Sequence, residues 1–65
     1  MPKDKEALAR MIAKRDGISV NEAHAAIREC TEWIENAISH GRFEEAFDIL
    51  REELGLEPDY MDILF

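Results

Sequence analysis

Two amphipathic helical patterns joined at one glycine constrain this chain more than any other feature of its sequence. The first pattern begins at Ser19, which with Glu22 three residues later forms a capping box, a common start signal of a helix. It ends at Gly41, a residue type that readily adopts the positive φ found just after a helix. The second pattern follows from Arg42 to Gly55. Because a short turn makes consecutive helices antiparallel neighbours, the sequence predicts a helical hairpin.

A further helical pattern precedes the hairpin, and a short apolar segment follows it. The expected helices span about 4–15, about 20–39 and about 42–54, with an apolar tail at 59–65. We expect one domain over 1–65 with an all-α fold, a three-helix up-down-up bundle with an antiparallel hairpin at Gly41 and a short C-terminal turn or helix. The predicted core consists of Leu8, Ile12, Ile27, Cys30, Ile34, Ile38, Phe43, Phe47, Leu50 and Leu54.

The charge of the chain is strongly asymmetric. Eight basic and fifteen acidic residues give a net charge of −7. Residues 1–16 hold five of the basic and three of the acidic residues, so their charge is +2, and residues 17–65 hold three and twelve, so theirs is −9. Direct binding to phosphate backbones requires clustered basic residues, so we expect no nucleic-acid binding. An acidic body of this kind suits a basic protein surface.

The cysteine, the histidines and the apolar runs of the sequence indicate where the protein is located and whether it binds a cofactor. A lone cysteine is typical of a reducing compartment, and no apolar run approaches the roughly 18 residues of a membrane span. We therefore expect a cytoplasmic protein that does not bind membranes. His24 and His40 lie about 24 Å apart along one helix, too far to share an ion. No metal, cofactor or catalytic site is expected, and Cys30 is interpreted as a small core residue.

The surplus of large apolar residues is the best sign of an interaction surface. Trp33 and the tail are the candidate apolar anchors, because exposed aromatic residues often dominate binding. Two interpretations of the tail stay open, one in which it completes the core and one in which it contacts a partner. The acidic face could imitate nucleic acid or serve solubility alone. The candidate interaction residues are Glu29, Glu32, Trp33, Glu44, Glu45, Asp48, Tyr60, Met61, Ile63, Leu64 and Phe65.

Part of the hairpin is similar to a known helical repeat. Its second helix combines a glycine turn, an aromatic residue, a small residue and a closing proline at Gly41, Phe43, Ala46 and Pro58. In this respect residues 27–58 resemble a single unit of the tetratricopeptide repeat family. The resemblance implies an antiparallel hairpin. It does not imply the family's peptide-binding groove, because Ile34 replaces a small residue and no sister units are present.

These observations favour a small non-enzymatic protein-interaction module over an enzyme. In overall style the chain also resembles small acidic proteins encoded by phages and prophages. That likeness implies an inhibitor or adaptor whose acidic helical face binds a basic protein surface, for instance on a nucleic-acid-binding protein. The alternative is a structural or assembly module that forms a homodimer through its apolar C-terminal tail.

Overall fold

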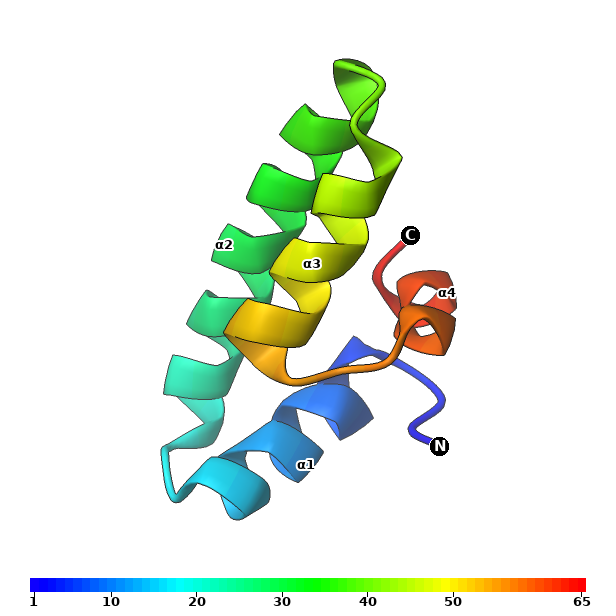
Figure 1. Ribbon diagram of the computed structural model, residues 1–65. Helices are drawn as coiled ribbons and strands as arrows, with labels where there is room; N and C mark the ends of the chain where they lie inside the picture. The colour runs from blue at the N-terminus through cyan, green and yellow to red at the C-terminus, as the bar shows by residue number, and fades with distance from the viewer.

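The computed structural model describes all 65 residues and contains helices only (Figure 1). The all-α bundle predicted from the sequence is confirmed, including the short C-terminal helix, and the three long helices differ from the expected ranges by at most one residue. No helix combines the length and the apolar composition needed to cross a bilayer. The elements are α1 (Lys5–Asp16), α2 (Val20–Ser39), α3 (Phe43–Leu54), a 3-10 turn η1 (Pro58–Tyr60) and α4 (Met61–Leu64).

Side chains near the start of α1 and α2 satisfy backbone groups that a helix leaves unpaired. The N–H of Glu22 donates to Oγ of Ser19 at 3.0 Å, and the N–H of Ser19 donates to Oε1 of Glu22 at 2.9 Å. The predicted capping box is therefore present. At α1, the N–H of Ala7 donates to Oδ1 of Asp4 at 2.8 Å. Both caps fix where their helices begin and so set the register of the faces that pack together.

The turn at Gly41 reverses the chain within a few residues. Gly41 has φ 74°, in the left-handed region that favours glycine, and the N–H of Arg42 then donates to the Ala37 oxygen at 2.8 Å. At the far end of α3, the N–H of Leu56 reaches back to the Leu50 oxygen at 3.4 Å, and Leu56 is buried. Leu56 thus folds back onto the last turn of α3 and satisfies a carbonyl that the helix end leaves unpaired.

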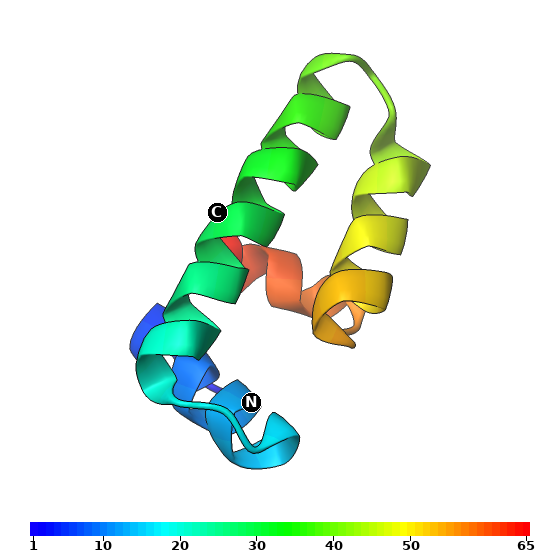
Figure 2. The same cartoon turned by 90° about the vertical axis from the view of Figure 1, so that its left-hand side faces the viewer.

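Helix α2 is the centre of the molecule, because it packs against both α1 and α3. Figures 1 and 2 show α2 and α3 side by side and antiparallel, with α1 against the part of α2 farthest from the Gly41 turn. The core forms where these three helices meet, and Leu54, Leu56 and Leu64 extend it toward the C-terminal segment. The predicted core residues that are buried are Leu8, Ile12, Ile27, Cys30, Ile34, Leu50 and Leu54.

Three residues predicted to lie in the core are exposed, and this part of the prediction is wrong. Ile38, Phe43 and Phe47 have exposed fractions of 38, 59 and 41%. All three lie near the Gly41 turn, at the end of the hairpin that we call the hairpin tip. The cause is helix length: α1 has 12 residues and spans about 18 Å, whereas α2 has 20 and spans about 30 Å. No long helix covers the tip.

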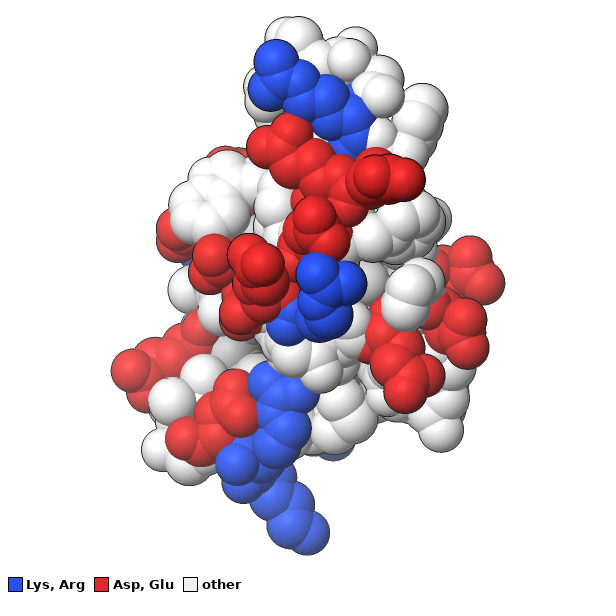
Figure 3. Space-filling model, in the orientation of Figure 1, with Lys and Arg blue, Asp and Glu red and all other residues white.

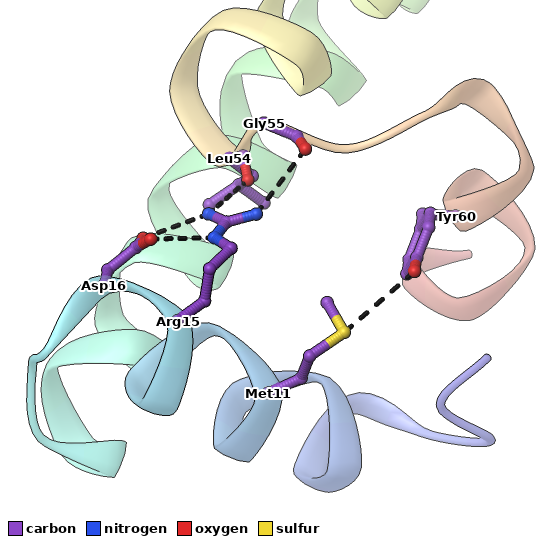
Figure 4. A network of polar contacts seen from close by, with 6 residues as sticks. All are labelled: Met11, Arg15, Asp16, Leu54, Gly55 and Tyr60. Carbon is purple, nitrogen blue, oxygen red and sulfur yellow. Dashed lines mark hydrogen bonds and ion pairs between the residues drawn. The ribbon is translucent and has the colours of Figure 1, made fainter.

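A polar contact holds α1 against the end of α3 (Figure 4). The Arg15 guanidinium donates to the Leu54 oxygen at 2.7 Å, lies 3.5 Å from the Gly55 oxygen, and pairs with Asp16 at 2.7 Å. The hydrogen bond to Asp16 is the largest cause of a raised Arg15 pKa. We call this set of contacts the Arg15 latch. It fixes the point from which the chain leaves α3 toward α4.

Candidate functional site

An open groove of about 570 Å³ lies between the hairpin tip and the C-terminal segment. We call it the tip groove. One wall comes from the hairpin, namely Ile38, Phe43, Ala46 and Phe47. The other comes from η1, α4 and the last residue, namely Pro58, Asp59, Met61, Asp62 and Phe65. More apolar residues line it than line any other hollow of the molecule. Three of them are exposed large hydrophobic residues of the hairpin.

The hairpin wall follows from the helical periodicity of α3. Phe43 and Phe47 are four residues apart, so they lie one above the other on the helix face that also carries Leu50. Leu50 is fully buried in the core, whereas the two phenylalanines are exposed. Ile38 comes from the last turns of α2, and Ala46 is a buried floor between the walls. Two aromatic rings therefore face solvent beside an aliphatic side chain.

The tail wall is held in place by its own buried residues. Leu64 is buried in the core, and the Tyr60 hydroxyl lies 4.0 Å from the Met11 sulfur of α1 (Figure 4). Met61 is half-buried, and Phe65 is 56% exposed at the groove. The interpretation in which the tail completes the core holds for Leu64, and contact of the tail with a partner stays a prediction. One part of the segment completes the core, and another part faces the tip groove.

The groove is acidic where it is polar. Its charged lining residues are Asp59 and Asp62, and no basic residue lines it. Lys3 and Lys5 share a neighbouring hollow with these two carboxylates, but no ion pair forms between them. Figure 3 shows carboxylates over the α4 segment and along α3, on either side of uncharged surface. A cationic group at the groove rim would therefore meet carboxylates without an intramolecular partner.

Some carboxylates of the acidic face expected from the sequence form ion pairs with arginines of the same chain. On α3, Asp48 pairs with Arg51 at 2.7 Å and Glu45 lies 3.8 Å from Arg42. Glu44 forms no ion pair and follows Phe43 along the helix. Ion pairs between exposed side chains contribute little stability, so these arginines chiefly reduce the local negative charge. Glu44 is the α3 carboxylate that adds uncompensated charge beside the groove.

The carboxylates of α2 lie away from the tip groove. Glu29 and Trp33, one turn apart, line a shallow hollow with Glu53 of α3. Glu32 lines a separate hollow with Arg28 and with Lys5 of α1. The acidic residues chosen from the sequence therefore do not form one continuous face.

Trp33 and the C-terminal segment, the two apolar anchors proposed from the sequence, lie on different faces. Trp33 is 45% exposed, and the two hollows that it lines share no residue with the tip groove. Trp33 lines one of these hollows with Ile49 and Glu45, and the other with Glu29. A partner seated in the tip groove would not contact the indole directly. Of the two anchors, only the tail lines the same groove as the exposed phenylalanines.

Cys30 has the surroundings of a core residue. It is buried, and burial raises the pKa of its thiol to about 11, with the negative charge of Glu53 as a smaller cause. At neutral pH the thiol is therefore protonated, whereas nucleophilic attack requires the thiolate. His24 lies 2.7 Å from Glu6 and links α2 to α1. No three His, Cys, Asp or Glu side chains are placed to hold a metal ion.

The residues missed by sequence reasoning are those that complete the groove. The sequence pattern places Ile38, Phe43 and Phe47 in the core and does not single out Asp59 and Asp62 as site residues. The unequal lengths of the predicted helices are a usable signal, because a 12-residue helix cannot cover both ends of a 20-residue one. Comparisons of the chain with protein-family models, with curated proteins and with solved structures found no match.

Proposed function

We propose that this protein is a non-enzymatic protein-interaction module, an inhibitor or adaptor that binds its partner through the tip groove. The observation that carries the proposal is the exposure of Phe43 and Phe47 beside Met61 and Phe65. Each Å² of buried apolar surface contributes about 25 cal/mol to the free energy of folding. The exposed rings therefore stabilise the fold less than buried rings would. Contiguous apolar surface on a small protein is typical of a binding site.

The charge of the chain supports a basic partner. Residues 17–65 carry −9, and the groove contributes Asp59 and Asp62 without an internal ion pair. A field of one sign raises the rate of encounter with an oppositely charged surface and disfavours acidic competitors. In this proposal the apolar groove supplies affinity, and the surrounding carboxylates supply steering and selectivity.

Differential capture from the lysate of the organism that encodes the chain tests the proposal. The baits are the wild type, a Phe43→Ser/Phe47→Ser variant and a Trp33→Ser control, which removes an exposed aromatic residue from the other face. We expect a partner that the wild type and the control retain and the groove variant loses. A partner retained equally by all three baits would contradict the proposed function.

Salt and charge reversal test the electrostatic part separately. With the captured partner purified, binding should weaken as ionic strength rises, because screening shortens the reach of surface charges. Glu44→Lys should weaken binding more than Glu32→Lys, which lies in a hollow apart from the groove. Affinity that is insensitive to salt and to both changes would show that the acidic surface serves solubility alone.

A further inference from the structure

We infer that the occupant of the tip groove is an amphipathic helix of another protein, with a large apolar face flanked by Lys and Arg. The inference rests on the proposed function and assigns the class of partner segment. Three features of the groove select this occupant, namely the spacing of its apolar residues, the absence of any strand edge and the sign of its charge.

The apolar side chains are spaced as a receptor for a helix. Phe43 and Phe47 are one helical turn apart, about 6 Å along the α3 axis. Ile38 extends this surface toward the turn, and Met61 faces it from the other wall. A docked helix presents its own anchors at intervals of three, four and seven residues, which match a surface with the period of one turn. The spacing of the apolar residues in the groove therefore suits the face of a docked helix.

An extended peptide would form fewer favourable contacts with this surface than a helix would. Peptides that bind as strands obtain affinity from main-chain hydrogen bonds to an exposed sheet edge. This protein has no strand, and the hairpin wall of the groove comes from α2 and α3, whose interior backbone groups pair within each helix. A helix satisfies its own backbone and needs only apolar contact. The secondary structure of the protein thus favours a helical occupant.

Charge distinguishes a basic helix from a second copy of this chain. Self-association through the groove would bring the Asp59 and Asp62 carboxylates of two copies, each of net charge −7, into one interface. Like charges brought together at an interface are costly. A helix with Lys or Arg beside its apolar face would instead pair with Asp59, Asp62 and the nearby Glu44. The uncompensated carboxylates therefore act as a filter on what enters the groove.

A display library tests the class of occupant while the partner itself is still unidentified. Peptides of about 18 residues, or five helical turns, are randomised and selected on the full-length wild type. Binders that also bind Phe43→Ser/Phe47→Ser are removed. We expect the remaining peptides to have apolar residues at helical spacing and a positive net charge. Enrichment of peptides with period-two alternation, or with a negative net charge, would overturn the inference.

Matched measurements on one selected peptide complete the test. In fluorescence anisotropy, Phe47→Ala should weaken binding by about thirtyfold or more, the range of an interface hot spot. Trp33→Ala is the control, and its affinity should equal that of the wild type. Replacing the Lys and Arg of the peptide by Glu should weaken binding by a similar factor. Equal affinity for basic and acidic versions would show that the groove does not select charge.

Sedimentation and capture separate the possible failures. A dimer of the wild type that Phe47→Ser abolishes would identify a second copy as the occupant and overturn the inference. If no basic helix is selected while lysate capture still requires Phe43 and Phe47, the proposed function holds and the class of occupant is wrong. If capture does not require them, the proposed function itself fails.

Discussion

Replacing Arg15 by Gln should destabilise the protein far more than its exposed position on α1 suggests. The side chain is 39% exposed, yet its guanidinium is the group that joins α1 to the C-terminal end of α3. It donates to the Leu54 oxygen at 2.7 Å, where the unpaired carbonyls of α3 attract a cation. A glutamine side chain is shorter and neutral, so it cannot reach this carbonyl or replace the charge.

The magnitude follows from the contact. A hydrogen bond to a charged group contributes about 1.5–3 kcal/mol, and partial exposure argues for the lower end, about 1.5 kcal/mol. The pair with Asp16 is exposed and adds little. At about 0.05–0.15 kcal/mol per residue, a chain of this length has a total stability of about 3–10 kcal/mol. The loss should therefore lower the melting temperature by about 6–12 °C.

Urea unfolding followed by circular dichroism measures the change, with Arg10→Gln as the matched control. Arg10 lies on the same helix and pairs only with Glu6, four residues away, so its replacement should cost no more than about 0.5 kcal/mol. Arg15→Lys should fall between them, because it keeps the charge but loses the planar fork. Equal unfolding midpoints for Arg15→Gln and Arg10→Gln would refute the latch.

Three further changes probe the tail, the thiol and the helix cap. Leu64→Ala removes a buried anchor of α4 and should cost about 2–4 kcal/mol, whereas Phe65→Ala at an exposed position should stay within about 0.5 kcal/mol in the same urea assay. Cys30 should react with a thiol reagent only after unfolding, because its pKa is raised to about 11 by burial; rapid reaction of the native protein would contradict this. The pKa of Glu22 is lowered from 4.5, chiefly by the backbone N–H of Ser19, so its contribution to stability is present above pH 4.5 and is lost as the pH falls through the folded-state value. In acid titrations Glu22→Gln should therefore lose stability less steeply than the wild type below pH 4.5, and parallel curves would show that the charge of Glu22 contributes nothing.

Local signals in the sequence were sufficient to predict the helices. The capping box at Ser19 and the turn at Gly41 depend on residues within four or five positions of one another. Their chemistry is visible in a single stretch of chain. The direction in which each side chain points follows from the same local periodicity, so Ile34 and Leu50 were placed in the core correctly.

Whether a given face is covered depends on contacts between distant residues, and here the sequence was insufficient. Phe43 and Phe47 point in the predicted direction, but nothing long enough lies against them. The polar contact of α1 with the end of α3 is made by Arg15, whose partner is 39 residues away. Arg15 was predictable only as a cation in the last turn of a helix. The groove therefore became apparent only once the helices were placed relative to one another.

The negative charge and the exposed rings make better physical sense together than separately. Phe43 and Phe47 stabilise the fold less than buried residues would, and on a neutral protein such rings would favour self-association. Here Asp59 and Asp62 line the same groove and Glu44 adjoins Phe43 in the sequence, so we expect two copies approaching through their grooves to repel one another. The same repulsion becomes attraction for a basic helix. Under the proposed function, one set of carboxylates would thus keep the groove open to solvent and select what closes it.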